Sequence, residues 1–441
     1  MLKPLEKIDT YFLFVLFTGT ILRIISLIIT PIGPDFLSFV NAARGIISFN
    51  YYTYGTFRPP GFPITIVPFL LLTKNNFILS SKLASFFTSI ILIYYSYYIF
   101  TAASKKFYNK DDEKIEYKAK LIGLIVSYLI SLNLYFVVNT GRGLREDLLA
   151  LLFILAFYFT IIKEKMEKKD ILYLIITISL LTLTLLSAGI FFAIGIILFY
   201  FISKLKYFEF EKMSLKKLLI VLLTVFSSFS FWALFSAFTI GDPLYNFQVQ
   251  GAFFKDYHNL EFSSIENIID AAINAIIFGI PFEVYYLFLI ISLIFTFLVF
   301  YIIIKNYEQK QILFIIIIIV INFLYISIFM APSKTLAIPN HPRVIMYFFL
   351  YVFYMGSIPL GKILFEYQKK KNINTKNMNF VFICFLITYS LQGLIYWFDY
   401  QGFPPPIHPL LLILFLSDEV FLLIFLIKSR HIDYIMIDES Q

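Results

Sequence analysis

A small set of charged residues lies between long apolar runs of this sequence and could take part in chemistry. Asp35 follows the first apolar run, and Arg58 stands directly before Pro59-Pro60-Gly61. The other charged or titratable candidates border later runs: Arg142, Arg145, Glu146, Asp147, His341 and Arg343. Arginine can bind phosphate oxygens through a bidentate fork, so four arginines around a few carboxylates suit an anionic substrate such as a phosphate.

The composition shows what kind of protein must position these residues. Of 441 residues, 60% are hydrophobic, 20% are aromatic and only 15% are charged, whereas a soluble domain has about 25% charged residues. The apolar runs are long and lack the alternation of a β-barrel, so we expect membrane-spanning helices rather than a large soluble catalytic domain. The single cysteine, Cys384, lies in an apolar run and excludes a disulfide framework or a cysteine-based metal site.

Twelve apolar runs are long enough to cross a bilayer. They fall near 11–30, 77–101, 119–138, 147–162, 171–187, 188–202, 218–238, 282–304, 311–330, 343–360, 379–397 and 409–427. A further run, 63–73, would form a helix only roughly 16 Å long, too short to cross alone. The predicted fold is therefore an all-α, polytopic membrane protein of about 12 transmembrane helices, with 63–73 embedded or interfacial.

The basic residues orient these helices, because lysine and arginine accumulate in short cytoplasmic loops. With both termini cytoplasmic, 26 of the 36 basic residues face the cytoplasm. The remaining ten are Arg23, Arg44, Arg58, Lys74, Lys82, Arg142, Arg145, Lys255, Lys334 and Arg343. If 63–73 crossed, all of the 26 except Lys3 and Lys7 would face outward. The net charge of +8 thus reports orientation in a cell membrane and indicates no nucleic-acid partner.

Two predicted outer segments are long enough to form part of a site. In 31–60, Phe36, Phe39, Val40 and Ala43 share one helical face, which is typical of a helix in the membrane interface. In 239–281, Ser263 and Glu266 have the spacing of a capping box, which predicts a second interfacial helix. We therefore divide the chain into a transmembrane module at 1–238 with the first outer loop 31–60, the outer loop 239–281, and a C-terminal transmembrane region at 282–441.

These features together resemble the GT-C superfamily of membrane glycosyltransferases. The resemblance rests on an acidic residue after the first span, on Asn41-Ala42-Ala43-Arg44, and on Pro59-Pro60-Gly61-Phe62-Pro63. Further matches are 140–150, Gly241-Asp242-Pro243 and His341-Pro342-Arg343. Within this superfamily, the sequence is most similar to the branch that contains the protein O-mannosyltransferases and the lipid A aminoarabinose transferase. This branch resembles glycosyltransferase family 39.

The resemblance implies that a sugar moves from a polyprenyl-phosphate donor to a protein, glycan or lipid acceptor on the extracytoplasmic side, with inversion. It assigns Asp35 as general base. Arg58, Arg142, Arg145 and Arg343 are the expected phosphate-binding residues. The expected supporting residues are Glu146, Asp147, His341 and Arg44. A lipid phosphate is already a good leaving group, so no cofactor is required and no metal ligand is assigned; a divalent cation is compatible but not indicated.

Two departures from the family and several alternatives stay open. The first-loop site has one acidic residue where many relatives have two, and 185–189 lacks the phosphate-binding lysine of many relatives. Asp35 could simply cap a helix, and the charges around Arg145 could be a solvated helix end. Arg23, Asp418 and Glu419 lie at predicted membrane depth; they could pair with one another, or belong to a transporter or flippase for a lipid-linked or anionic solute. A lipid-linked oligosaccharide ligase would share the same topology.

Overall fold

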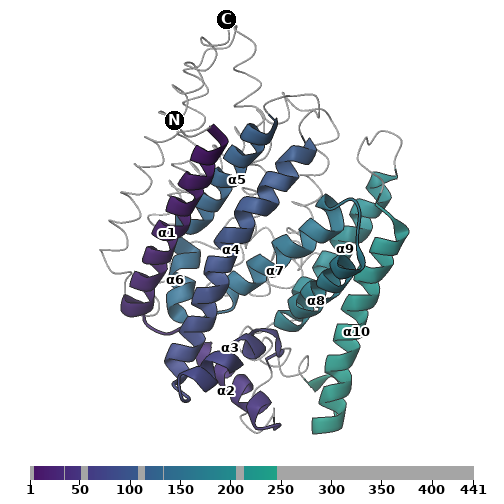
Figure 1. The fold of residues 1–441 in the computed structure, drawn as a ribbon. Coiled ribbons are helices and arrows are strands. Elements are labelled where there is room, and N and C mark those ends of the chain that lie inside the picture. Colours follow the sequence, from purple (N-terminus) through teal and green to yellow (C-terminus); the bar gives the residue numbers. More distant parts are fainter. Residues whose placement is uncertain are drawn as a thin grey trace, which may run out of the picture.

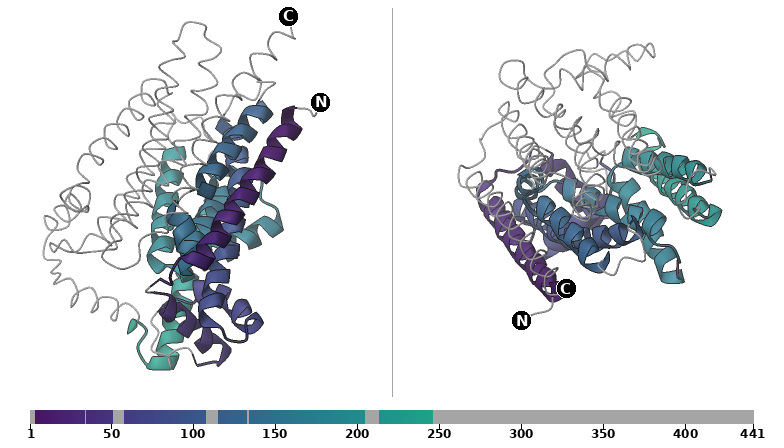
Figure 2. Two further views of the ribbon diagram at one scale, coloured as in Figure 1. Left: turned by 90° about the vertical axis from the view of Figure 1, so that its left-hand side faces the viewer. Right: turned by 90° about the horizontal axis from the view of Figure 1, so that it is seen from above.

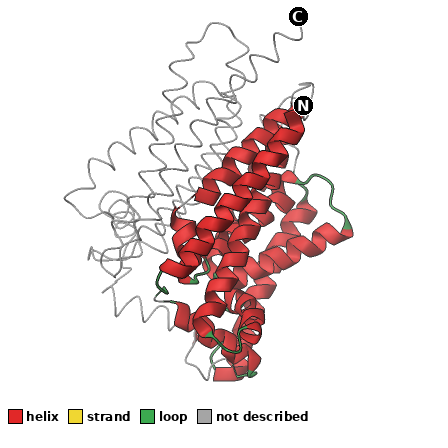
Figure 3. Ribbon diagram, turned by 60° about the vertical axis from the view of Figure 1, so that its left-hand side comes forward, coloured by secondary structure: helices red, strands yellow, loops and turns green. Residues whose placement is uncertain are grey.

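The computed structural model describes residues 4–33, 35–50, 58–107, 115–132, 134–204 and 213–245. All regular secondary structure in these ranges is helical (Figure 3), so the expectation of an all-α chain is confirmed for them. The loop 239–281 beyond Tyr245 and the five spans predicted after it lie outside the described residues. So do Cys384, His341, Arg343, Asp418 and Glu419, and the total of twelve spans therefore stays a prediction.

The described part consists of ten α-helices and one π-helical turn. They are α1 (Pro4–Ile29), α2 (Phe36–Ile47), α3 (Gly61–Leu72), α4 (Phe77–Phe107), α5 (Ile115–Leu132), α6 (Leu134–Arg142), α7 (Glu146–Phe157), η2 (Tyr158–Ile162), α8 (Lys168–Thr184), α9 (Leu186–Ser203) and α10 (Leu215–Ile240). Each of the seven apolar runs predicted before residue 240 is largely helical, although Leu185 in the run 171–187 is extended and separates α8 from α9; that every run crosses the membrane stays a prediction.

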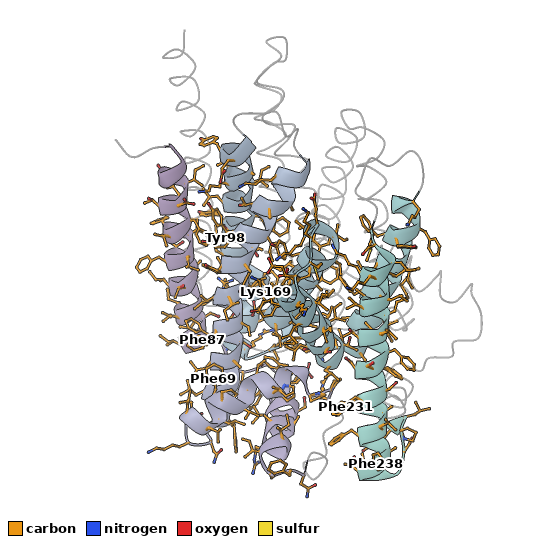
Figure 4. The ribbon with its side chains drawn as sticks, turned by 45° about the vertical axis from the view of Figure 1, so that its right-hand side comes forward. Phe69, Phe87, Tyr98, Lys169, Phe231 and Phe238 are labelled. Carbon is orange, nitrogen blue, oxygen red and sulfur yellow. The ribbon has the colours of Figure 1, made fainter. Side chains whose placement is uncertain are left out.

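Three helices in the part of the chain that the structure describes are long and apolar enough to cross a membrane. These spans are Ile8–Ile29, Phe77–Lys105 and Leu215–Ile240. Ala119–Leu132 and Phe136–Arg142, which bend by 47° relative to one another, have the length and composition of a fourth span if the pair crosses as one unit, and otherwise form a re-entrant loop. The protein is thus an integral membrane protein. On α10, Phe231 and Phe238 are 61% and 88% exposed and extend from the helix in Figure 4, as side chains that face lipid do.

Helices α1 to α7 are arranged around α4, and α8, α9 and α10 pack against one another. Helix α4 packs against α1, α5 and α7 along the bundle and against α2 and α3 at one end. Figure 1 shows α2 and α3 side by side at this end, and Figure 2 shows α1 and α10 on opposite sides of the described helices. The rings of Phe69 in α3 and Phe87 in α4 stack with centroids 5.3 Å apart (Figure 4). The short helices are therefore fixed to the end of α4.

The predicted amphipathic helix and the short apolar run both form helices. In α2, the side chains of Phe39, Val40 and Ala43 are buried, as the predicted face requires. The short run forms α3, which starts two residues earlier than predicted and has 12 residues; at 1.5 Å per residue it is about 18 Å long and cannot span a bilayer by itself. The interfacial location of both helices stays a prediction.

Two buried basic side chains bind backbone carbonyls at helix ends. The Lys82 ammonium donates to the carbonyls of Leu27 and Thr30 at 2.8 and 2.6 Å, at the end of α1. The Arg23 guanidinium donates to the carbonyls of Ser131 and Ile130 at 2.7 and 3.2 Å, where α5 ends. The last carbonyls of a helix have no partner within it and carry partial negative charge. A cation there supplies both a hydrogen-bond donor and a compensating positive charge.

Arg23 is fully buried and also donates to the Gly19 carbonyl, at 3.1 Å, and to the Ser89 hydroxyl. These contacts join α1, α4 and α5 beside the bend between α5 and α6. The hypothesis that Arg23 pairs with the acidic residues of the last predicted span concerns positions outside the described residues. The contacts just described give this charge a structural role independent of that pairing.

We expect Arg23→Met to destabilise the protein, because it leaves buried carbonyls at the end of α5 without a donor. Each unsatisfied buried group costs about 1–3 kcal/mol, so the apparent unfolding midpoint in detergent should fall by several degrees. Leu13→Met, at a 64% exposed position on the same helix, is the matched control and should leave the midpoint unchanged. An equal midpoint for Arg23→Met and Leu13→Met would contradict this role.

Candidate functional site

The Asp35 carboxylate and the Arg58 guanidinium form an ion pair at the end of the bundle that contains α2 and α3. Asp35 Oδ1 lies 2.8 Å from an Arg58 nitrogen, and the two side chains are 34% and 17% exposed. Arg58 Nε also donates to the Ser38 hydroxyl at 3.2 Å, and that hydroxyl donates to the Asp35 carbonyl at 2.7 Å. The structure therefore joins two predicted site residues that are 23 positions apart in sequence, and the pair is accessible from outside.

The Asp35 side chain does not cap α2. Asp35 occupies the N-cap position, but its side chain makes no capping hydrogen bond. The alternative reading of this residue as a side-chain helix cap is therefore wrong. Its carboxylate points to Arg58 instead of to the first amides of α2.

Arg145 reaches the same place from the turn between α6 and α7. Its guanidinium carbon lies 5.4 Å from the ring centroid of Phe39, and that of Arg58 lies 5.1 Å from the same centroid. Arg145 also donates to the Thr184 carbonyl at 3.1 Å, at the end of α8. Two arginines predicted to bind phosphate thus meet at one aromatic ring, one helical turn after Asp35.

The turn that carries Arg145 is held tightly by its neighbours. Gly143 has φ of +70°, and the amides of Gly143 and Leu144 donate to the carbonyls of Thr140 and Asn139, which is a Schellman motif. The Ser81 hydroxyl of α4 donates to the Gly143 carbonyl at 2.7 Å, and Ser85 donates to the Leu144 carbonyl. This geometry determines the direction in which Arg145 leaves the turn.

The charged residues next to Arg145 are buried rather than solvated. Arg142 and Glu146 are 6% exposed and Asp147 is fully buried, so the interpretation of this group as a solvated helix end is wrong for these three. The Thr140 hydroxyl donates to Asp147 Oδ2 at 3.0 Å. Both acidic residues lie in the first turn of α7, where the helix dipole stabilises negative charge.

Arg142 contributes its backbone to the site. Its carbonyl accepts a hydrogen bond from the Gly33 amide at 3.0 Å, which fixes the connection between α1 and Asp35 to the end of α6. The predicted phosphate-binding role of the Arg142 guanidinium stays a prediction, as do the supporting roles of Glu146 and Asp147.

The structure does not bring Arg44 to Asp35. Its guanidinium carbon lies 4.8 Å from the ring centroid of Phe77, at the start of α4. Nine residues of helix separate it from Asp35, which is about 13 Å along the helix axis. Arg44 therefore belongs to the packing of α2 on α4. The other two predicted site residues, His341 and Arg343, lie outside the described residues.

Metal binding has no support in the ranges that the structure describes. No three histidine, cysteine, aspartate or glutamate side chains there are grouped so that they could hold a metal ion. The expectation that catalysis requires none stays a prediction.

Sequence reasoning missed three contributors to this site: Ser38, Phe39 as a partner of arginine, and Thr184. Ser38 and Phe39 follow Asp35 by three and four positions, a spacing that places helical side chains on one face, so this signal was present. Thr184 had no such signal. Its contact with Arg145 depends on how α8 packs.

Comparison with known proteins gives a likeness in fold. No protein-family model matches the sequence, and no curated protein sequence matches it. The structure is similar to that of archaeal oligosaccharyltransferase AglB from Archaeoglobus fulgidus, which was solved in complex with an inhibitory peptide and a dolichol-phosphate. The TM-score is 0.50 at 11% sequence identity, and the match covers 91% of this chain. This chain spans only 57% of the length of that neighbour. The likeness therefore shows a shared fold and does not by itself assign an activity.

Close contact between Gly61 and Thr184 brings Arg58 and Arg145 together. A Cβ at Gly61 would lie 2.4 Å from Thr184 Oγ1 and 2.5 Å from the Thr184 amide nitrogen. Because the second of these atoms belongs to the backbone, α3 and α8 can touch only if residue 61 is a glycine.

We expect Gly61→Ala to push α3 away from α8 and to destabilise the protein by about 1–3 kcal/mol, as overpacking does. The apparent unfolding midpoint in detergent measures this. Leu72→Ala, at a 76% exposed position of the same helix, is the control. A midpoint for Gly61→Ala equal to that of the unchanged protein would show that the two helices do not need this contact.

Proposed function

We propose that the protein is a membrane glycosyltransferase that moves a sugar from a polyprenyl (dolichyl)-phosphate donor to an acceptor, with inversion at the anomeric carbon. The observation that carries the proposal is the group formed by Asp35, Arg58 and Arg145: an accessible carboxylate is paired with Arg58, and the guanidiniums of Arg58 and Arg145 lie over one aromatic ring at the end of a helical membrane bundle. The fold shared with an oligosaccharyltransferase supports a lipid-linked donor. The narrower assignment to the O-mannosyltransferase and aminoarabinose transferase branch of GT-C rests on the sequence resemblance.

Asp35 has the chemistry of the general base. An acceptor hydroxyl attacks the anomeric carbon, and its proton passes to the Asp35 carboxylate as the new carbon–oxygen bond forms. The bond from the anomeric carbon to the phosphate oxygen breaks, and its electron pair leaves with the phosphate. The ion pair with Arg58 and the hydrogen bonds of Ser38 orient the carboxylate before the acceptor arrives.

Among the arginines that the structure describes, Arg145 is the best placed to bind the leaving phosphate. Its guanidinium donates to a neutral backbone carbonyl and lies over an aromatic face, and no carboxylate of the described residues lies within salt-bridge distance of it. Charge develops on the phosphate oxygens as the donor bond breaks, and a fixed cation there stabilises the transition state. Arg58 can add a second positive charge while it holds Asp35, and Arg343 stays a candidate for a third.

The module 1–238 carries this site, while the loop 239–281 and the region 282–441 would complete the walls around the substrates. The distribution of basic residues supports an orientation with both termini in the cytoplasm and the site on the extracytoplasmic side of the cell membrane. The acceptor approaches Asp35 from water, and the donor enters from the bilayer. The peptide bound to the similar oligosaccharyltransferase favours a protein acceptor, with a glycan or a lipid as the other options.

Transfer of a preassembled oligosaccharide is the second candidate function, because the similar structure is an oligosaccharyltransferase. The two functions differ in the donor. A single sugar on a polyprenyl monophosphate serves as substrate in the first, whereas a lipid-linked oligosaccharide serves in the second. Offering both donors to the purified protein and measuring which is consumed separates the two functions.

We expect Asp35→Asn to lower sugar transfer from polyprenyl-phosphate donors by about 100-fold or more, the usual contribution of a general base. Transfer to acceptors in membranes or proteoliposomes measures this. Asp9→Asn is the matched control: Asp9 is also a half-exposed carboxylate paired with a cation, Lys120, at 2.7 Å, but it lies at the other end of α1.

Undiminished transfer by Asp35→Asn would remove the general-base assignment. Solute transport by the purified protein in liposomes, with no transfer from any lipid-linked donor, would instead favour the transporter or flippase alternative.

We expect Arg145→Gln to weaken donor use because it removes a charge-assisted contact to phosphate. The kcat/KM for the donor should fall about tenfold or more, while the KM for the acceptor changes little. Arg44→Gln is the control, since Arg44 packs on Phe77 away from Asp35. Equal donor kinetics in the Arg145 and Arg44 variants would refute the assignment of Arg145 to the phosphate.

A further inference from the structure

The ring of Phe39 is the contact shared by Arg58 and Arg145. Both guanidinium carbons lie over this ring, at 5.1 and 5.4 Å from its centroid. Both distances are within the roughly 6 Å at which the negative face of an aromatic ring attracts a cation. The two guanidinium carbons can therefore be no farther apart than the sum of these distances, although their residues are 87 positions apart in the sequence.

The Phe39 ring is itself immobilised. Phe39 is 2% exposed and Phe62 is fully buried, and their rings pack edge to face with centroids 5.1 Å apart and planes at 89°. The Phe39 amide also donates to the Asp35 carbonyl at 3.4 Å. The ring is thus held by α2 on its backbone side and by the start of α3 on its other side, so it can serve as a fixed reference for the arginines.

The two arginines share the ring of Phe39, and each also has partners of its own. Arg58 is located by Asp35, by Ser38 and by the ring, whereas Arg145 is located by the Thr184 carbonyl and by the ring. Two like charges close together repel one another, and the attraction of both to the same aromatic ring offsets part of this repulsion. An aliphatic side chain at position 39 could fill the same space but would supply no such attraction.

We propose that Phe39 is a positioning residue that holds Arg58 and Arg145 by cation–π contacts so that both guanidiniums can bind one donor phosphate. The proposal rests on the proposed function, because it takes the lipid phosphate as the ligand of these arginines. Phe39 contacts neither the acceptor hydroxyl nor the carbon that reacts. Its effect passes through the two guanidiniums and therefore depends on the electrons of its ring as well as on its shape.

Fluorinated phenylalanines at position 39 test this dependence in the full-length protein. Mono-, di- and trifluorophenylalanine keep the ring shape nearly constant while they weaken its negative face. The Kd for a polyprenyl phosphate without sugar, measured from the ligand-induced rise in unfolding midpoint, should increase stepwise by roughly three- to thirtyfold across the series. The kcat/KM for the donor should fall in parallel, and the midpoint without ligand should stay nearly constant.

The same series at Phe77 is the matched control. That ring also binds an arginine, Arg44, at 4.8 Å, but away from Asp35, so its fluorination should leave the Kd for the polyprenyl phosphate unchanged. In the Arg145→Met background, the effect of fluorination at Phe39 should shrink, because one of the two cations is gone.

The outcomes separate this inference from the proposed function. Stepwise loss of polyprenyl-phosphate binding at Phe39, with no sugar transfer by the unchanged protein, would support the inference and contradict the proposed function. Sugar transfer with a Kd that is independent of fluorination would overturn the inference and leave the function intact. Failure of the unchanged protein to bind a polyprenyl phosphate, or equal effects at Phe39 and Phe77, would also overturn it.

Discussion

The structure depends on how backbone polar groups at helix ends are satisfied inside a membrane bundle, because lipid offers them no hydrogen-bond partner. In a membrane, each unsatisfied amide or carbonyl costs several kcal/mol. Lys82 binds the carbonyls at the end of α1, and Arg23 binds those at the end of α5. Serines of α4 do the same for the turn after α6. These contacts allow helices to end and bend inside the protein.

The candidate site is a consequence of these ends. A continuous helix from Ile115 to Phe157 would place no turn beside α2. Because α6 ends in a glycine turn that α4 holds, Arg145 projects toward Phe39. Because α8 ends at Thr184 and touches Gly61, the start of α3 carries Arg58 to the same ring. Asp35 lies beside Arg58 because the hydrogen bond from Gly33 to Arg142 fixes the connection between α1 and Asp35. Three segments distant in sequence thus deliver one carboxylate and two guanidiniums.

Hydrophobic patterning predicted much of the described fold and some of the site. The seven apolar runs before residue 240, the amphipathic α2 and the shortness of α3 follow from run length and helical periodicity. Asp35 and Arg58 stood out because charges are rare here. The burial of Glu146 and Asp147 could not be predicted in this way, since a charged pair at the start of a helix has the same pattern whether solvent or another helix covers it. The contact between Thr184 and Arg145 likewise leaves no local pattern.

The amino-acid sequence was sufficient to predict that this chain is a helical membrane protein, to propose an orientation from its basic residues, and to select the few charges that could have a chemical role. Composition and hydrophobic periodicity are local properties of a segment, and they determine directly whether that segment can enter the bilayer as a helix. Only the tertiary structure decided that Asp35 binds Arg58 rather than capping α2, that Arg44 packs elsewhere, and that Phe39 contacts both site arginines. Those outcomes depend on the approach of helices distant along the chain, which side-chain size and helix-end contacts determine together.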